Sequence, residues 1–359
     1  MRPRRFFIFV PTGTISSPIK GAVALANALV RERQVTFVAV KPGGDAFELL
    51  DKQVERIPLW TAGSWVSRIL AARRLLARAG GKREVAAVSY CLSADAVNRF
   101  CRDEAVTCSS VRGNLPAIYP EKYGRAGKWL AHRHLRMLRP LDHVVSMTHV
   151  MAEQVQAHIG RPSPVIGNFV DEAALEAHRR AGPDSGPFRF VFTGSMLPNK
   201  RPHAVLDAVR SLQTQGIAAR LDAYGDGPLL TDLRRQARSM PLPDSVCFHG
   251  HIHDPSAAVS AADALVLPSF TEGTSRSVLE ALYLGVPCVV RDIDGNRELI
   301  QPGRNGSVFA ADDQLSAAMV DTARWSRARA GQRDNLLPDS FRQALAARAY
   351  LRLLESDLP

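Results

Sequence analysis

The stretch Pro268-Ser-Phe-Thr-Glu-Gly-Thr-Ser-Arg-Ser-Val-Leu-Glu-Ala281 carries the pattern that decides the predicted fold. The apolar run Ala264–Leu267 before it has the length of a buried parallel strand. Apolar residues at helical spacing follow it, until Gly285 and Pro287 end the predicted helix. A strand, a tight turn and a helix N-terminus are therefore expected here, which is where open α/β sheets bind ligands.

The predicted turn combines acidic side chains with hydrogen-bond donors. Glu272 lies on the turn and Glu280 on the helix after it. Gly273 allows the backbone to approach a ligand, and the first amides of the helix point at whatever lies above them. Those amides, together with Arg276, suit a phosphate group. The alternative interpretation is two solvated glutamates on a surface helix.

In its surroundings, the spacing Glu272-x7-Glu280 resembles the signature of retaining GT-B glycosyltransferases, especially family 4 (glycosyl transferases group 1), of the bacterial surface-glycan type. This resemblance implies an α/β fold of two Rossmann-like domains that face each other across a cleft. It also implies a C-terminal helix that crosses back to the first domain. The resemblance is specific from about Phe188 to Phe309 and weak before Asn168.

The length of 359 residues, 46% of them hydrophobic, is suited to two globular domains. We expect an N-terminal acceptor-binding domain over 1–170, a linker over 171–187, a nucleotide-sugar-binding domain over 188–338 and a C-terminal helical segment over 339–359. No run reaches the roughly 18 apolar residues of a membrane span, and the apolar start is too short for a signal peptide. Five scattered cysteines without metal-ligand spacing indicate reduced thiols in the cytoplasm.

The positive charge of the chain is concentrated in its first half. Residues 1–170 hold 25 Lys and Arg against 12 Asp and Glu, which makes +13, so the rest of the chain carries −2 of the total +11. This asymmetry predicts an anionic partner for the first domain. A phospholipid surface, a lipid-linked diphosphate and nucleic acid all have that charge, and the resemblance implies a glycan or lipid-linked glycan acceptor and no nucleic acid.

Two basic segments of the first half also contain tryptophan and aliphatic residues, one at 60–83 and the other at 128–139. Such helices can lie in the interface of a bilayer, which would place the protein on the inner face of the membrane. The alternative is a pair of ordinary amphipathic helices with solvated arginines.

Loops of the first domain provide the candidate acceptor-binding residues. Gly13 and Thr14 follow the first predicted strand in a loop that is not a dinucleotide fingerprint, and the family has an acceptor-facing loop at this place. Arg112 and Asn114 follow another strand, near the point where many relatives have a histidine. Arg112 is a candidate for binding an acceptor phosphate, and a purely structural role is the alternative.

The run Gly194 to Lys200 is similar to the family's phosphate-binding segment, in which an arginine and a lysine bind the donor diphosphate. Lys200 matches, whereas Ser195 stands at the usual place of the arginine. Arg276, or else Arg201, is expected to replace it. An exposed loop lysine is the alternative for Lys200. Carried over residue by residue, the resemblance implies a donor site formed by Gly194, Ser195, Lys200, Arg201, Gly225, Gly250, His251, Glu272, Gly273, Thr274, Ser275, Arg276, Ser277 and Glu280.

Two further patterns invite a metal interpretation, and we reject both. His249, His251 and His253 alternate onto one strand face, but no carboxylate partner is evident in the sequence, and Gly250 matches the family's strand-to-loop glycine beside the nucleotide base. The run Asp292-Ile-Asp294 looks like a DxD motif, but its context resembles a loop of the metal-independent family. We therefore expect no metal and no cofactor, with a UDP- or GDP-sugar as substrate.

The resemblance implies a retaining transferase in polysaccharide or lipopolysaccharide assembly, in which Glu272, Lys200 and Arg276 act on the donor. Glu280 would hold the ribose and Glu272 the sugar. Two other functions are considered. A nucleotide-sugar epimerase of the same fold would form product without an acceptor. A non-enzymatic polyanion-binding protein would bind polyanions equally well when Glu272 or Glu280 is replaced.

Overall fold

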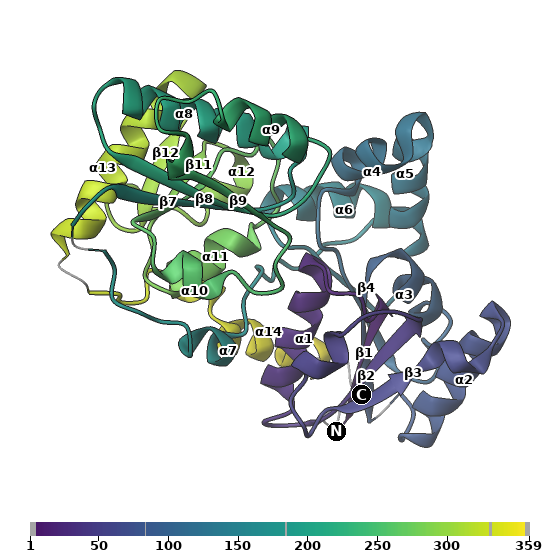
Figure 1. Ribbon diagram of the computed structural model, residues 1–359. Helices are drawn as coiled ribbons and strands as arrows, with labels where there is room; N and C mark the ends of the chain where they lie inside the picture. Colours follow the sequence, from purple (N-terminus) through teal and green to yellow (C-terminus); the bar gives the residue numbers. More distant parts are fainter. Residues whose placement is uncertain (1–4, 83, 184, 330–331, 356–359) are drawn as a thin grey trace. The chain divides into compact units, whose positions relative to one another are not determined.

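The computed structural model describes residues 5–355, apart from residues 83, 184 and 330–331. The chain divides into two compact units, of which unit 1 contains 1–171 and 339–359 and unit 2 contains 172–338. Over the described residues, each unit contains one six-stranded parallel sheet with helices on both faces (Figure 1).

In unit 1 the strand order is β3-β2-β1-β4-β5-β6, the order of a Rossmann sheet. The strands are β1 (Arg5–Thr12), β2 (Gln34–Lys41), β3 (Glu55–Pro58), β4 (Val85–Tyr90), β5 (Val106–Ser110) and β6 (His143–Val145). The α-helices are α1 (Ser17–Leu29), α2 (Trp65–Arg78), α3 (Cys91–Asn98), α4 (Leu115–Tyr123), α5 (Gly127–Met137), α6 (His149–Ile159) and α14 (Gln343–Glu355). Short 3₁₀ helices are η1 (Ala46–Leu49), η2 (Leu59–Ala62), η3 (Gly124–Ala126) and η7 (Asp339–Phe341).

The central strand β1 explains why both faces of this sheet are covered. Its residues alternate between two cores: Phe6 and Ile8 are buried with residues of α1 and α14, whereas Phe7 and Phe9 are buried with residues of α2 and α3. Successive side chains of a strand point to opposite faces, so a run of consecutive apolar residues requires helices on both sides.

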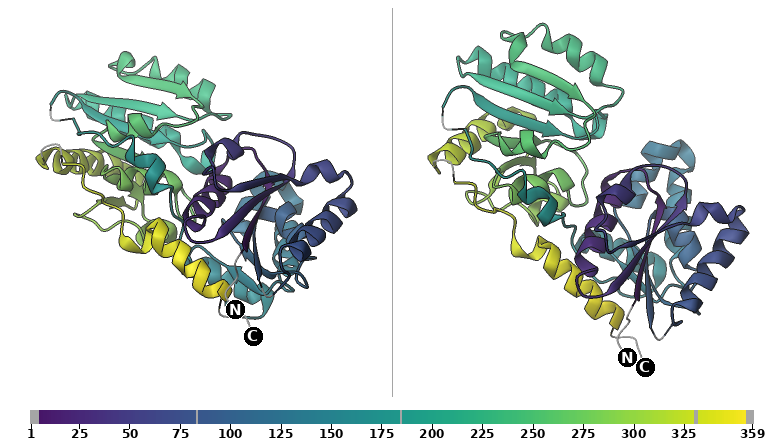
Figure 2. Two further views of the ribbon diagram at one scale, coloured as in Figure 1. Left: turned by 90° about the horizontal axis from the view of Figure 1, so that it is seen from below. Right: turned by 60° about the horizontal axis from the view of Figure 1, so that its bottom comes forward.

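The last described helix, α14, packs against α1 of unit 1 (Figure 2). The Gln343 side chain donates a hydrogen bond to the carbonyl of Ala24 at 2.8 Å. The buried hydroxyl of Tyr350 shares one with Ser110 Oγ at 2.8 Å. The chain therefore returns to its first unit after unit 2, which confirms the predicted crossing of the C-terminal helix.

In unit 2 the order is β12-β11-β10-β7-β8-β9. The strands are β7 (Phe188–Thr193), β8 (Ala219–Tyr224), β9 (Val246–Gly250), β10 (Ala264–Leu267), β11 (Cys288–Arg291) and β12 (Gly306–Phe309). The α-helices are α7 (Glu172–Glu176), α8 (Pro202–Thr214), α9 (Leu230–Ala237), α10 (Ser256–Ser260), α11 (Arg276–Tyr283), α12 (Asp294–Arg297) and α13 (Leu315–Ala328), with 3₁₀ helices η4 (Pro198–Lys200), η5 (Pro243–Ser245) and η6 (Asp312–Gln314). Because β7 pairs with both β8 and β10, the direction of winding reverses between β7 and β10.

The basic segment predicted over 60–83 is not one helix. It consists of the end of η2 and the helix α2, and residue 83 lies outside the described part. Trp60 belongs to η2 and stacks on Phe47 at 6.3 Å between ring centroids. Its ring therefore packs within unit 1. Among the described residues, no helix combines the length and the apolar character that crossing a bilayer requires.

Candidate active site

The carboxyl ends of β7 and β10 bring two predicted donor-binding segments together in unit 2. The loop after β10 begins at Pro268, and the loop after β7 contains η4. The amide of Phe270 donates to the carbonyl of Asn199 at 2.9 Å, which ties the two loops. Ser277 Oγ on α11 donates to the carbonyl of Thr193 at 3.0 Å. Loops at this point of reversal are where doubly wound sheets bind ligands.

An ion pair joins the two loops. Lys200 Nζ lies 2.5 Å from Glu272 Oε1, and their side chains are 23% and 10% exposed. Because both groups are partly withdrawn from water, this charge-assisted hydrogen bond is stronger than one on an open surface. The pair presents a cation and an anion beside each other at the edge of the sheet.

The helix N-terminus after Glu272 is enclosed by protein. Helix α11 begins at Arg276, with Ser275 in extended conformation at its N-cap. Thr274 and Ser275 are buried, and Arg276 is 8% exposed. The guanidinium predicted as a phosphate contact therefore lies mostly within protein. Glu280 is half-buried on the same helix.

Three predicted glycines meet at the ends of β7, β8 and β9. The Gly194 amide donates to Tyr224 at 3.0 Å, and the Gly225 amide donates to Gly250 at 2.7 Å. A Cβ on Gly225 would lie 1.8 Å from the carbonyl oxygen of Gly194, so only glycine fits there. Ser195 follows Gly194 on this edge, and His251 follows Gly250 and is exposed.

Gly295, which the sequence interpretation missed, packs against the backbone of the loop that carries Glu272. A Cβ on Gly295 of α12 would lie 1.8 Å from the carbonyl oxygen of Gly273 and 2.7 Å from that of Glu272. Helix α12 therefore approaches this loop as closely as glycine allows. The glycine in the run Asp292 to Glu298 was the available signal, but it does not say which backbone it contacts.

Arg201, one of the two candidates to replace the missing arginine, has partners within unit 2, and its role in donor binding stays a prediction. It has a left-handed backbone at φ 54°, and its guanidinium pairs with Asp312 and lies 4.7 Å from the ring centroid of Phe270. Arg291 also pairs with Asp312 and lies 4.8 Å from the same ring. Burial opposes ionisation of Asp312, but hydrogen bonds from Arg291 and Arg201 outweigh it and lower the pKa of the carboxyl.

In unit 1 the predicted acceptor residues lie on two loops. Gly13 and Thr14 follow β1, and a Cβ on Gly13 would lie 2.5 Å from the carbonyl oxygen of Gly43. Asn114 caps α4 by accepting a hydrogen bond from the amide of Ala117 at 3.2 Å.

Arg112 is partnered within the unit. Its guanidinium contacts Asn168, lies 3.4 Å from Ser110 Oγ and 5.6 Å from the ring centroid of Tyr90. These contacts agree with the structural alternative for Arg112, and they leave a role in acceptor binding as a prediction.

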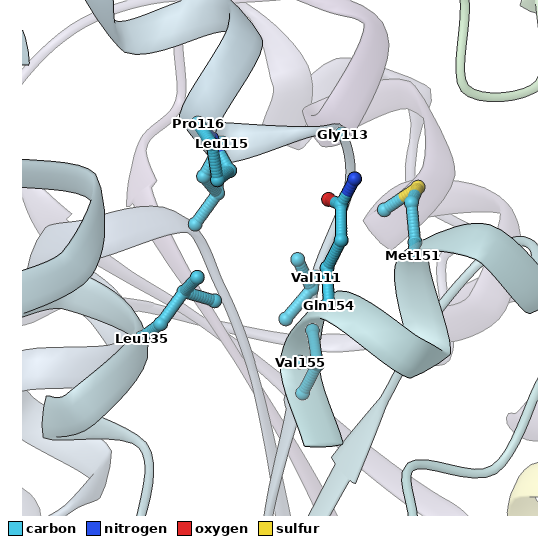
Figure 3. Close-up of a pocket in the computed structure, with 8 residues that line it drawn as sticks. All are labelled: Val111, Gly113, Leu115, Pro116, Leu135, Met151, Gln154 and Val155. Atoms are coloured by element: carbon cyan, nitrogen blue, oxygen red, sulfur yellow. The ribbon is translucent and has the colours of Figure 1, made fainter. Parts of the chain in front are cut away.

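The loop that carries Arg112 and Asn114 also borders a small, mostly apolar hollow (Figure 3). It is lined by Val111, Gly113, Leu115, Pro116, Leu135, Met151, Gln154 and Val155. The loop is thus in contact with α5 and α6 through apolar side chains.

Unit 1 also contains a buried polar network around Asp95, His134 and Tyr119, which the sequence analysis did not predict. Asp95 Oδ2 lies 2.8 Å from His134 Nε2, and His134 Nδ1 lies 2.7 Å from the hydroxyl of Tyr119. Asp95 Oδ1 accepts hydrogen bonds from Ser89 at 2.7 Å and from Ser109 at 2.8 Å. Burial raises the pKa of Tyr119. The network fastens α4 and α5 to the carboxyl ends of β4 and β5.

Comparison with known proteins gives one family for part of the chain. Residues 175–323 match the family model described as glycosyl transferases group 1. The chain is 28% identical over 157 residues to a putative colanic acid biosynthesis glycosyltransferase, WcaL of Salmonella typhimurium, covering 41% of this chain and 39% of that protein. It is 30% identical over 129 residues to an Escherichia coli UDP-Gal:α-D-GlcNAc-diphosphoundecaprenol α-1,3-galactosyltransferase, covering 35% and 33%. The matches therefore span less than half the length of these relatives.

Solved structures resemble the chain over almost its whole length. HepE from Anabaena, solved with UDP and glucose, has a TM-score of 0.70 at 17% identity, covering 98% of this chain and 99% of that one. WaaG, a glycosyltransferase involved in lipopolysaccharide biosynthesis, has a TM-score of 0.66 at 15% identity, covering 98% and 100%. This likeness confirms the α/β fold of two Rossmann-like domains, the GT-B fold.

Proposed function

We propose that the protein transfers a sugar from a nucleotide-sugar donor to a surface-glycan acceptor, on the premise that residues 175–323 match the model of the glycosyl transferases group 1 family. The observation that carries the proposal is the Lys200–Glu272 pair at the reversal point of the unit 2 sheet, within the matched segment. In this pair, Lys200 would provide a cation for the leaving diphosphate, and Glu272 would accept hydrogen bonds from the sugar.

The first requirement of the transfer is to neutralise the departing diphosphate. Lys200 and the first-turn amides of α11 are proposed to do this, with Arg276 supporting that turn. A hydrogen bond to a charged group contributes about 1.5–3 kcal/mol, so several together offset a large share of the developing charge. On donor binding, a phosphate oxygen would replace Glu272 as the partner of Lys200.

The second requirement is to hold the sugar and ribose in place. Glu272, once released by Lys200, is proposed to accept hydrogen bonds from sugar hydroxyls, and Glu280 from the ribose. We propose a retaining, metal-independent route, in which the acceptor hydroxyl attacks the same face that the diphosphate leaves. The leaving phosphate oxygen would take the proton of that hydroxyl.

The proposed acceptor is a lipid-linked glycan at an anionic membrane surface. The excess of +13 lies in residues 1–170, and the E. coli relative is named for a diphosphoundecaprenol acceptor. Two surfaces would meet the membrane. Val66 on α2 is 65% exposed and Trp129 on α5 is 59% exposed, and arginines lie on both helices.

The donor is tested by a thermal-shift screen of UDP-, GDP- and ADP-sugars on the wild type, Glu280→Ala and the exposed-site control Glu153→Ala. A donor at 100 times its Kd stabilises the native state by about 2.7 kcal/mol, so one nucleotide class should raise Tm by several degrees. The shift should be lost in Glu280→Ala and kept in the control. If all variants shift equally, the donor binds elsewhere and the proposal fails.

The reaction is tested by supplying that donor with and without a diphosphate-linked lipid acceptor and measuring released nucleoside diphosphate and glycolipid. Product that forms only with acceptor supports the transferase. Conversion of the donor alone would identify an epimerase. If no donor is turned over, and anionic polymers bind to Glu272→Ala as tightly as to the wild type, the protein is a polyanion-binding protein.

A further inference from the structure

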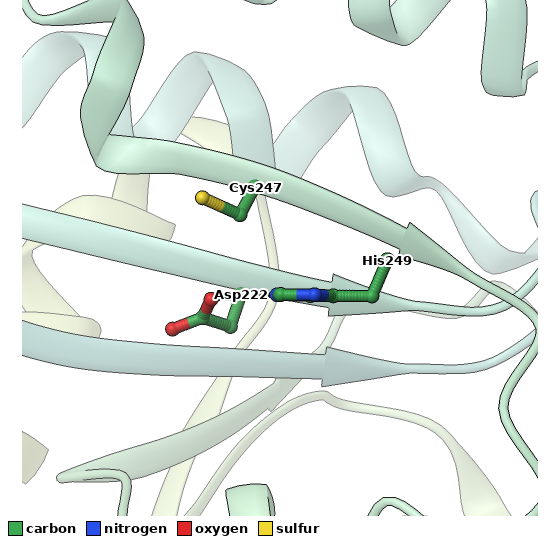
Figure 4. A group of neighbouring side chains, drawn as sticks. All are labelled: Asp222, Cys247 and His249. Atoms are coloured by element: carbon green, nitrogen blue, oxygen red, sulfur yellow. Dashed lines mark hydrogen bonds and ion pairs between the residues drawn. The ribbon is translucent and has the colours of Figure 1, made fainter.

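Three metal-ligand side chains meet on the unit 2 sheet, outside the proposed donor site (Figure 4). Asp222 on β8 and Cys247 and His249 on β9 offer a carboxylate, a thiol and an imidazole, with ligand atoms all within 4.8 Å of one another. Asp222 pairs with Cys247 in the strand register, and His249 follows two residues later. All three therefore project from the same face of the sheet.

This face is the more open one. Along β8, Ala219, Leu221 and Ala223 are buried, whereas Arg220 and Asp222 between them are not. Cys247 is half-buried and His249 is exposed. An ion from solution can therefore reach the cluster, and a water molecule can complete its coordination.

The imidazole is held in a defined orientation. The His249 ring stacks on Tyr224 at 4.4 Å between ring centroids and 9° between planes. Its Nε2 lies 2.8 Å from Asp222 Oδ1. These two contacts fix the His249 ring and hold its Nε2 next to Asp222 Oδ1.

Arg220 supports the cluster from outside. Its Nε donates to Asp222 Oδ2 at 3.3 Å, the oxygen that does not face His249, and its Nη2 lies 3.9 Å from Cys247 Sγ. The contact with the second carboxylate oxygen orients Asp222 as a ligand.

We propose that Asp222, Cys247 and His249 bind a thiophilic divalent cation of the Zn²⁺ class. A thiolate with an imidazole suits zinc and excludes the hard cations Mg²⁺ and Ca²⁺ as preferred occupants. Three protein ligands and one water make a tetrahedral site. Binding exchanges the His249–Asp222 hydrogen bond for two metal bonds and releases the thiol proton to solvent.

The site differs from the triple-histidine pattern that the sequence suggested. Only His249 is common to both, and its carboxylate partner Asp222 lies 27 residues away on the neighbouring strand. The ion would fasten the edge strand β9 to β8 just before Gly225 and Gly250. Its role is therefore structural, and the transfer step proposed above does not use it.

The test is titration of chelator-treated, tag-free protein with Co²⁺, followed by displacement with Zn²⁺. We expect one equivalent of Co²⁺ to produce a sulfur-to-cobalt charge-transfer band and tetrahedral d–d bands, which Zn²⁺ removes. Zn²⁺ should also raise Tm. Cys247→Ser should abolish the charge-transfer band, and His249→Ala and Asp222→Asn should each weaken binding at least tenfold. The controls Cys91→Ser and His253→Ala should behave as wild type.

The proposal is overturned if no charge-transfer band forms, or if Cys247→Ser retains it. It is also overturned if all three ligand variants bind Co²⁺ with the affinity of the wild type, since that identifies adventitious surface binding. Circular dichroism of each variant before titration separates loss of the site from loss of the fold. Donor binding is a separate measurement, so a failure here leaves the proposed transferase function untouched.

Discussion

Lys200 Nζ and Glu272 Oε1 lie 2.5 Å apart, although 72 residues separate them in the chain. Each is the other's partner before any donor binds. In the proposed reaction, a diphosphate that binds Lys200 must therefore compete with Glu272, and the released carboxylate would become available to the sugar. This relationship separates the two roles experimentally, because one residue would act on the nucleotide part of the donor and the other on the sugar.

Glu272→Gln should leave binding of the free nucleoside diphosphate unchanged or a few-fold tighter, since Lys200 loses its competing anion. Sugar transfer should fall by about 10- to 100-fold, because a charged hydrogen bond to the sugar is worth about 1.5–3 kcal/mol. Calorimetric titration with the nucleoside diphosphate and steady-state kinetics measure the two effects.

Lys200→Met is the matched comparison, since it removes the cation and keeps the aliphatic stem. Nucleoside diphosphate binding should weaken about 10- to 100-fold, as expected for one charge-assisted contact. Equal weakening in Lys200→Met and Glu272→Gln would contradict the division of roles.

Gly295→Ala should displace the loop that carries Glu272. The new Cβ would lie 1.8 Å from the backbone oxygen of Gly273, and no side-chain rotation relieves a clash with backbone. We expect a loss of about 1–3 kcal/mol in the free energy of unfolding, as in overpacked interiors, and donor affinity at least tenfold weaker. Urea unfolding and the donor-induced Tm shift measure these effects.

Gly303→Ala provides the control for Gly295→Ala. Gly303 has a φ of 77° and no atom within 4 Å of an added Cβ, so its substitution introduces backbone strain without a clash. It should lower stability by about 1 kcal/mol and keep donor affinity. A donor affinity lowered equally by both substitutions would argue against a specific contact between α12 and the loop.

Tyr119→Phe and His134→Gln should each destabilise unit 1, because each leaves a buried polar atom of the Asp95 network without its partner. We expect about 1–3 kcal/mol for each in urea unfolding. The double variant should lose less than the sum, since both changes break the same hydrogen bond. Strictly additive losses would show that the two residues act independently.

Acidification should weaken unit 2 through Asp312, whose pKa is lowered by Arg291 and Arg201 against the effect of burial. Its charged form stabilises the fold above the pKa of an unfolded aspartate, about 3.9. This contribution is lost as pH falls below that value and through the lower folded pKa. Asp312→Asn should therefore lower Tm by about 2–4 °C at pH 7, which corresponds to about 1 kcal/mol for a half-exposed pair.

The difference in Tm between wild type and Asp312→Asn should shrink progressively below pH 4, when the wild type loses the same charge. The neighbouring exposed Asp313→Asn serves as the control and should have little effect at either pH. A difference that stays constant from pH 7 to pH 3 would show that the charge of Asp312 does not stabilise unit 2.

Much of the fold was predictable because its signals are local. The apolar run Phe6–Val10 and the run Ala264–Leu267 each describe a strand buried on both faces. The helix after Glu272 ends near Gly285 as its sequence indicates. The segments predicted to bind the donor lie within the part of the chain that matches the family model, and each is a short run of residues whose order alone carries the resemblance.

The amino-acid sequence by itself determined which segments become strands and helices. It also determined which of these segments contain glycines, acidic residues and basic residues. Only the tertiary structure decided which side chains meet: Lys200 with Glu272, Arg201 with Asp312, and His249 with Asp222 and Cys247. The physical reason is that a helix or strand is encoded by neighbours in the chain. A contact between strand ends depends instead on strand order and register, which the packing of the whole sheet determines.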